Sequence, residues 1–227
     1  MKLIIENWRR FLNEQSGGSI ENIINEMFQD KHVLDGKPWG RILRARALKI
    51  KDTIKKAAVA SEMDPAGLLA LIAVESSFIP GAKSSKSTAT GYTQMLSSAR
   101  KEIYEKRIGR IWHDDARQKP GTTKQRWQIE HFSPLSVAQA KQVMNYNESP
   151  EINILAGALY LSYLIKSHKR TTDEEDYEYS EDSTVGSYYR ALCEYSGQGR
   201  ENTDCSYAKK IEKILSYDTI EKGVGKK

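Results

Sequence analysis

Residues 68–82 read LLALIAVESSFIPGA and place one acid, Glu75, at the end of an apolar run. Leu68, Leu71 and Ile72 precede it at the spacing that puts all four side chains on one helix face. The face that should be buried therefore ends in a carboxyl group. Burying a carboxylate is costly unless it is paired, hydrogen-bonded or protonated. Glu75 is thus either a functional residue or a helix-end acid that reaches solvent or pairs with Lys or Arg.

The charge of the chain is unevenly distributed. The sequence has 227 residues, with 35 Lys and Arg against 30 Asp and Glu, for a net charge of +5. Residues 171–184 hold seven acids and no Lys or Arg. Because these residues carry a charge of −7 and the whole chain carries +5, the rest of the chain carries +12. A basic body suits an anionic polymer such as nucleic acid, a membrane surface or a cell wall. Because the chain has no nucleic-acid recognition motif, we do not expect nucleic-acid recognition.

Several common functional motifs are absent from the sequence. The four histidines are scattered without HExxH spacing, and there is no P-loop or GxGxxG. We therefore expect no metal and no cofactor. The apolar runs are far short of the ~18–20 residues that a membrane span needs. Cys193 and Cys205, the only cysteines, either close a small loop or remain thiols.

Hydrophobic periodicity predicts an all-α fold, since strand patterns are nearly absent. Helical patterns cover about residues 19–30 and 39–61. The helix that carries Glu75 then starts after Asp64, a suitable N-cap, with Pro65 at its first position. Further helices are predicted in SPLSVAQAKQVM, SPEINILAGALYLSYLIKSH, VGSYYRALCEYSGQG and SYAKKIEKILSY.

The remaining segments predict loops and chain ends. Small and polar residues at 83–93, KSSKSTATGYT, predict a loop that can wrap closely around a neighbouring group. The acidic stretch at about 171–184 predicts a mobile, solvated loop. We expect a tag and linker at 1–18, one domain over 19–220 and a flexible tail at 221–227.

Three sequence blocks resemble the soluble lytic transglycosylases and their goose-type lysozyme relatives. The first is ESSFIPGAKS at 75–84 followed by ATGYTQM at 89–95, which is similar to the family pattern E-S-x-F-x-P-x-A-x-S, then A-x-G-x-x-Q. The second is NILAGALYL at 153–161, and the third, weaker block is CEYSGQG at 193–199. The resemblance covers about residues 64–210. It implies a lysozyme-like all-α domain of the transglycosylase type, here with an enlarged middle insertion.

The insertion and some motif positions depart from the family pattern. The segment between the first two blocks, about residues 97–149, is longer than a minimal family member needs, and its sequence predicts short helices. Tyr92 and Thr93 replace the usual Leu-Met pair, and Ser196 replaces an Asn. In the second block we expect structural roles for Asn153, Gly157 and Tyr160, which would pack a helix behind the site.

The resemblance implies that Glu75 is the catalytic acid and base. Cleavage of a glycosidic bond needs an acid that is still protonated near neutral pH. An apolar pocket can raise a carboxyl pKa to about 6, as in lysozyme. Leu71, Ile72 and Phe78 can supply such a setting for Glu75.

A standard glycosidase also needs a second carboxylate. No Asp or Glu occurs between residues 76 and 101, but acids farther along the chain could fold back: Asp114, Asp115, Glu130 and Glu148. The resemblance implies a route with one carboxylate, in which the substrate closes a 1,6-anhydro ring. A hydrolytic muramidase and a catalytically inactive structural virion protein of the same fold remain alternatives.

The resemblance also implies substrate-binding residues. Gln94 and the Gly91 backbone would hold a substrate sugar. The loop before them is one residue longer than the common family spacing, so Ser84 and Ser85 both fit the serine that hydrogen-bonds near the catalytic acid. Tyr195 would stand beside that acid or line the sugar cleft, and packing alone is its alternative role. The expected partner is therefore a peptidoglycan glycan strand.

The N-terminal segment MKLIIENWRRFLNE, residues 1–14, lacks the features of a secretory signal. It resembles the capsid-targeting peptides of large contractile-tailed phages, which a prohead protease cuts after an L-x-E or I-x-E site. Leu12-Asn13-Glu14 supplies such a site, and QSGGS follows it. This resemblance implies phage capsid or tail proteins and a prohead protease as partners, with the protein in the virion and acting in the host periplasm. The alternatives are a bacterial periplasmic protein and an ordinary amphipathic first helix.

Overall fold

The computed structural model describes residues 19–30, 33–34, 37–85, 87–110, 123–145, 149–173, 183–197 and 205–224. Within these ranges the protein is built from ten helices: α2 Ile20–Met27, α3 Gly40–Lys49, α4 Lys51–Ser61, α5 Pro65–Ser76, α6 Ser97–Arg107, α7 Thr123–His131, α8 Val137–Met144, α9 Pro150–Asp173, α10 Ser183–Tyr195 and α11 Ser206–Val224. Two short antiparallel strands, β1 Val33–Leu34 and β2 Lys37–Pro38, form the one sheet of the described chain. The predicted all-α fold is confirmed.

Helix α5 starts and ends at strong local signals. The Asp64 side chain caps it by accepting a hydrogen bond from the Gly67 N–H at 3.2 Å, and Pro65 occupies the first turn, as predicted. Every residue from Ala66 to Ala73 is buried. A helix that is apolar on all sides belongs in a core, and α5 is indeed packed by α2, α4 and α11.

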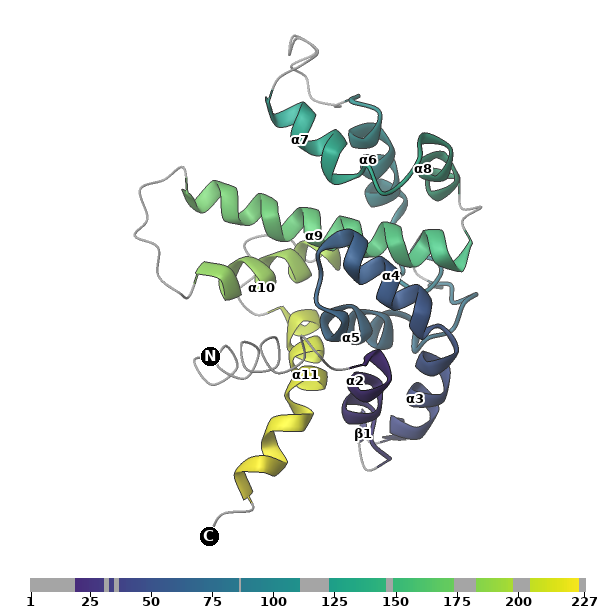
Figure 1. Cartoon of the computed structure of the whole chain (residues 1–227), viewed down its shortest axis with the longest axis vertical. Helices are drawn as coiled ribbons and strands as arrows, with labels where there is room; N and C mark the ends of the chain where they lie inside the picture. Colours follow the sequence, from purple (N-terminus) through teal and green to yellow (C-terminus); the bar gives the residue numbers. More distant parts are fainter. Residues whose placement is uncertain are drawn as a thin grey trace.

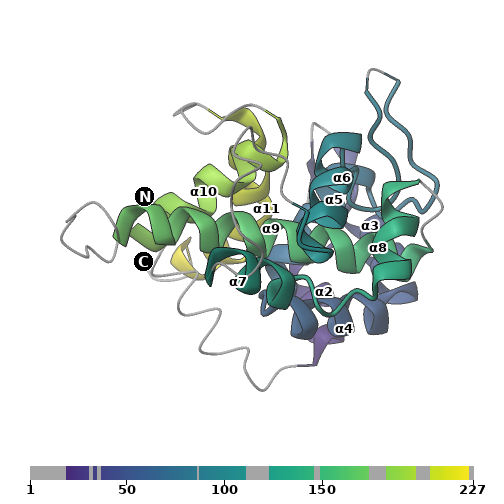
Figure 2. The ribbon, with the colours of Figure 1, turned by 90° about the horizontal axis from the view of Figure 1, so that it is seen from above.

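Helix α9 is the long element that joins the two sides of the domain. It packs against α4 and α10, and α6 and α8 also contact it (Figure 1). In Figure 1, α6, α7 and α8 lie above α9, whereas α5, α2 and α11 lie below it. The view from above in Figure 2 again shows α9 running through the middle of the domain. The core therefore forms where α9 meets α4 and α5.

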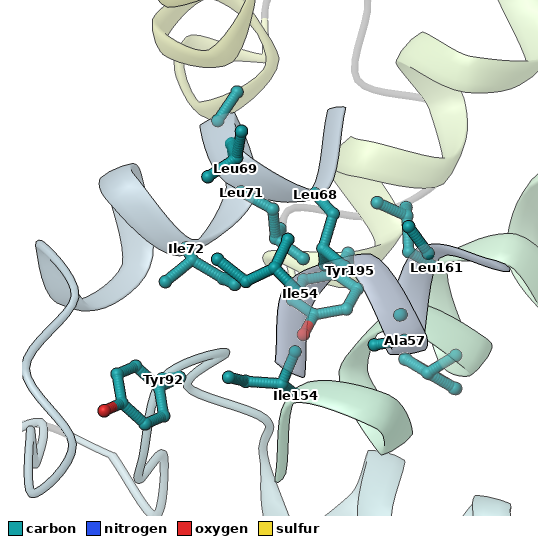
Figure 3. Close-up of a cluster of buried hydrophobic side chains, with 14 of the residues drawn as sticks. Ile54, Ala57, Leu68, Leu69, Leu71, Ile72, Tyr92, Ile154, Leu161 and Tyr195 are labelled. Carbon is teal, nitrogen blue, oxygen red and sulfur yellow. The ribbon is translucent and has the colours of Figure 1, made fainter. Parts of the chain in front are cut away.

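A cluster of apolar side chains fills that core. Figure 3 shows α5 directing Leu68 and Leu71 toward Ile54 of α4, with Ile154 and Leu161 of α9 beside them. Each of these five side chains is fully buried. Burying a Leu or Ile side chain stabilises the fold by about 1.5–3 kcal/mol. The cluster therefore anchors the helix that carries Glu75.

Helix α9 also approaches the loop after α5 very closely. A Cβ atom placed on Gly157 would lie 2.5 Å from the Thr93 Cβ and Oγ1 atoms. The Thr93 N–H donates to the Asn153 Oδ1 at 3.0 Å, and the Thr93 hydroxyl donates to the Asn153 carbonyl at 3.2 Å. Tyr160 donates from its hydroxyl to Glu102 Oε2 at 2.9 Å. The expected structural roles of these α9 residues are confirmed.

Three boundaries differ from the predictions. The single helix expected over 39–61 is divided at Ile50, whose φ of −120° and ψ of 15° separate α3 from α4. The division lets each helix bury a face of its own, with Leu43 and Ala47 on α3 and Ile54 on α4.

The other two corrections concern chain segments expected to be irregular. Helix α9 continues to Asp173 and α10 begins at Ser183, so both ends of the predicted acidic loop are helical. Helix α11 likewise runs to Val224, beyond the predicted domain end at 220. Adding one residue to an existing helix gains a hydrogen bond without a new nucleation cost, which favours such extension. The predicted tag at 1–18 lies outside the described residues.

Replacement of Gly157 tests the contact between α9 and the loop. We expect Gly157→Ala to destabilise the protein by about 1–3 kcal/mol, because its methyl group would overlap Thr93. Urea unfolding followed by circular dichroism measures this change. Gly81→Ala is the matched control, since a Cβ there meets nothing within 4 Å. Equal stability of the two variants would contradict the close contact.

Candidate active site

Glu75 lies in the last turn of α5, immediately before a tight reversal of the backbone. Ser77 ends the helix with φ 51°, and Phe78 follows with φ 59°. Two successive non-glycine residues in the left-handed region cost free energy and persist only where neighbouring groups hold them. Phe78 is 3% exposed and packs edge-on against Phe28, with ring centroids 5.5 Å apart. Arg46 of α3 donates from Nη1 to the Ser77 carbonyl at 3.0 Å. These contacts fix the end of α5 and therefore the position of Glu75.

The Glu75 carboxyl group is partly buried and hydrogen-bonded. The Tyr207 hydroxyl donates to Glu75 Oε1 at 2.5 Å. Burial raises the pKa of Glu75 from 4.5 to about 7, and the Tyr207 hydrogen bond opposes this by stabilising the carboxylate. Among the described residues, no Lys or Arg contributes to this pKa. Glu75 therefore holds its proton in a large fraction of molecules at neutral pH.

Two buried tyrosine hydroxyls lie in the field of Glu75. Burial first, and then the Glu75 charge, raise the pKa values of Tyr195 and Tyr207 well above their ordinary value. Both hydroxyls therefore remain protonated donors. Tyr195 donates to the Thr93 carbonyl at 2.9 Å, so its hydroxyl also ties α10 to the loop after α5. Tyr195 therefore has the packing role, and its predicted role beside the catalytic acid or in the sugar cleft stays a prediction.

The loop after α5 is held by its own polar groups. Gln94, in the left-handed region with φ 46°, donates from Nε2 to the carbonyls of Ala82 at 2.8 Å and Gly91 at 2.7 Å. The Gly91 N–H donates to the same Ala82 carbonyl at 2.8 Å. Gly91 has φ 79°, and a Cβ there would lie 2.4 Å from Asn153 Nδ2. Gln94 and Gly91 therefore shape this loop, and their predicted contacts with a sugar stay a prediction.

The two candidate serines occupy different environments in that loop. Ser84 is partly buried, and its N–H donates to the Ala89 carbonyl at 3.1 Å. Ser85 is exposed. The predicted hydrogen bond from one of them to the neighbourhood of Glu75 stays a prediction.

A fully buried arginine fastens the same loop from the other side. Arg100 of α6 donates from Nη1 to the Thr90 hydroxyl at 2.9 Å and from Nη2 to the Thr88 carbonyl at 2.6 Å. Its side chain is 0% exposed. A buried guanidinium is stable only when it is well hydrogen-bonded. The loop therefore supplies acceptors to both Nη atoms of Arg100, and Arg100 restrains the loop.

Sequence reasoning missed Tyr207 and Arg46. Tyr207 lies 132 residues from Glu75, and its one signal is an aromatic residue with a polar tip in the first turn of the last predicted helix. Arg46 lies in a basic helix where several residues could have made the same contact. Neither residue belongs to the sequence blocks that indicated the site.

No candidate metal site is found among the residues that the structure describes. It contains no group of three or more His, Cys, Asp or Glu side chains that could hold a metal ion. Within the same ranges no single helix is long and apolar enough to cross a membrane, although the bent pair α4 and α5 passes that test by length and composition.

Comparison with known proteins finds one match, to a part of the chain. Residues 52–123 match the family model described as the transglycosylase SLT domain. This range contains Glu75, the Gln94 loop and α6, which are parts of the site described above. This part of the chain is therefore similar to the transglycosylase SLT domain, which supports the resemblance that the sequence blocks predicted. No curated protein and no solved structure matches the chain.

Removal of the Tyr207 hydroxyl tests the electrostatics of the site. We expect Tyr207→Phe to raise the Glu75 pKa from about 7 by roughly one unit, because the carboxylate loses a hydrogen-bond donor. Carbon-13 NMR titration of the carboxyl group measures this directly. Tyr189→Phe is the matched control, because its hydroxyl donates to the Cys205 carbonyl rather than to Glu75. A Glu75 pKa that is unchanged or lower in Tyr207→Phe would disprove this account.

Proposed function

We propose that the protein is a peptidoglycan lytic transglycosylase. It would cleave the β-1,4 bond between N-acetylmuramic acid and N-acetylglucosamine and leave a 1,6-anhydro-N-acetylmuramic acid end. The observation that carries this proposal is Glu75, an acid at the end of a buried helix with a pKa of about 7. The family match supports the same class of activity and the same substrate.

In the first step, protonated Glu75 donates its proton to the glycosidic oxygen as the bond to C1 breaks. The N-acetyl group of the substrate supports the positive charge that develops at C1. A pKa near the working pH suits this step, because a useful fraction of the acid is protonated and its proton is easily given up. The Tyr207 hydrogen bond then stabilises the carboxylate that remains.

In the second step, the Glu75 carboxylate accepts the proton of the sugar C6 hydroxyl. The C6 oxygen forms a bond to C1, which closes the anhydro ring and restores protonated Glu75. The reaction consumes no water. One residue thus acts as acid and then as base, which the near-neutral pKa permits in both directions.

The surroundings of Glu75 favour this route over hydrolysis with two carboxylates. Among the described residues, no second carboxylate contributes to the Glu75 pKa. Glu130, one of the four candidates, is exposed on α7. The other three, Asp114, Asp115 and Glu148, lie outside the described residues. A mechanism that draws the second reacting group from the substrate needs none of them.

The decisive experiment is mass spectrometry of digested peptidoglycan. We expect muropeptides with 1,6-anhydro ends from the unaltered protein. The activity of Glu75→Gln should fall by roughly 10²–10⁴-fold, because the amide can neither donate nor accept the proton. Glu130→Gln, which removes an exposed acid, should retain full activity.

Three results would contradict parts of this proposal. Products that carry reducing ends, heavier by one water, would identify a hydrolytic muramidase. Near-normal activity of folded Glu75→Gln would remove Glu75 from the reaction. The absence of any cleavage by the folded, unaltered protein would favour a structural virion protein of the same fold.

We further propose that the protein is packaged in a phage particle and opens the wall locally from the host periplasm. The support is the sequence of residues 1–14 with its Leu12-Asn13-Glu14 site. Its partners would be capsid or tail proteins and a prohead protease. N-terminal sequencing of protein from purified particles should find Gln15 first. A particle-bound form that still begins at Met1 would disprove the processing.

A further inference from the structure

The two cysteines meet behind the candidate active site. Cys193 lies near the end of α10, and Cys205 directly precedes α11. Both are thiols, and both are 0% exposed. The side chains are hydrogen-bonded to each other, and burial together with this contact raises the pKa of Cys193 to about 12. A sulfur atom of α10 and one at the start of α11 are therefore in contact inside the core.

The backbone around Cys205 is held in place by both helices. Its sulfur accepts a hydrogen bond from the Ala208 N–H at 3.5 Å, as an N-cap side chain does. Its carbonyl accepts from the Lys209 N–H at 3.2 Å, and from the Tyr189 hydroxyl of α10 at 3.3 Å. The contact between the sulfurs thus lies in an ordered junction of α10 and α11.

We propose that Cys193 and Cys205 form a disulfide when the protein meets an oxidising environment, and that this bond fastens the start of α11 to the end of α10. The oxidant is a disulfide of low molecular weight, such as oxidised glutathione. The thiolate of one cysteine attacks a glutathione sulfur and releases one glutathione thiolate. The second cysteine thiolate then attacks the protein sulfur of the mixed disulfide and releases the other. The protein loses two thiol protons and two electrons, which reduce the glutathione disulfide.

The environment of the pair indicates a structural bond rather than a rapid sensor. Only a thiolate attacks a disulfide, and a buried thiol with a raised pKa is rarely ionised at neutral pH. Exchange therefore requires either folding under oxidising conditions or a transient separation of α10 from α11. Once formed, a buried bond resists reduction, because a reducing thiolate has poor access to its sulfur atoms and a thiol with a raised pKa is a poor leaving group.

The position of the pair connects it to Glu75. Tyr195 follows Cys193 by two residues, and Tyr207 follows Cys205 by two residues. The disulfide would therefore fix the distance between the helix ends that carry both tyrosines. The effect on activity rests on the proposed function, whereas formation of the bond does not.

The test uses the full chain in buffers of oxidised and reduced glutathione. The unaltered protein, unfolded and refolded in the oxidised buffer, should become lighter by two hydrogen atoms. Digestion without reductant should release a peptide pair that joins Cys193 to Cys205. Lasting glutathione adducts, covalent dimers, or two thiols that still react after unfolding would each disprove the pairing. Cys205→Ser is the control and can form only an adduct or a dimer.

The melting temperature tests whether the disulfide stabilises the junction of α10 and α11. A disulfide that closes a loop of this length should raise Tm by roughly 6–12 °C relative to the reduced protein. An unchanged Tm in protein that carries the bond would overturn the claim that the disulfide holds α11 to α10. If the bond forms and raises Tm but neither form cleaves peptidoglycan, the proposed function fails and the disulfide stands.

Discussion

The burial of one carboxyl group at the end of an apolar helix is the constraint on which the rest of the site depends. Glu75 has a pKa of about 7 in the folded protein against an ordinary value of 4.5. Its contribution to stability is therefore fully present below about pH 4.5 and is lost as pH rises through about 7, at a cost of about 3 kcal/mol. The same shift that would let Glu75 act as an acid thus destabilises the fold at alkaline pH. The burial of the apolar side chains of α5 stabilises the fold and offsets part of this cost.

The surroundings of Glu75 are rigid because several buried polar groups satisfy one another. Arg46 holds the carbonyl that follows the end of α5, and Arg100 holds the next loop through Thr88 and Thr90. Thr93 joins that loop to α9 through the Asn153 side chain. Each of these groups would be costly to leave without a partner. Their mutual hydrogen bonds therefore specify one arrangement of the loop.

The sequence predicted those parts of the site whose signals are local. Asp64 and Pro65, two adjacent residues, define the start of α5. The spacing of the apolar side chains predicted that Glu75 lies at the end of the buried face of this helix. Tyr207 was not predicted because its contact with Glu75 spans 132 positions and depends on how α11 crosses α5. The division at Ile50 was missed because the apolar spacing continues through it. Such features depend on packing between residues that are far apart in the chain, and the local patterns of a single sequence do not reveal that packing.

The close approach of α9 to the loop has a consequence for how this sequence can evolve. Gly91 and Gly157 leave no room for a methyl group, since Asn153 and Thr93 occupy the space that a Cβ would need. Residues in such contact have non-additive effects when they are changed together. A larger residue at either glycine becomes tolerable only after its neighbour has shrunk or moved. Homologous sequences should therefore show these four positions changing in concert, as a covarying set that records the contact of α9 with the loop beside Glu75.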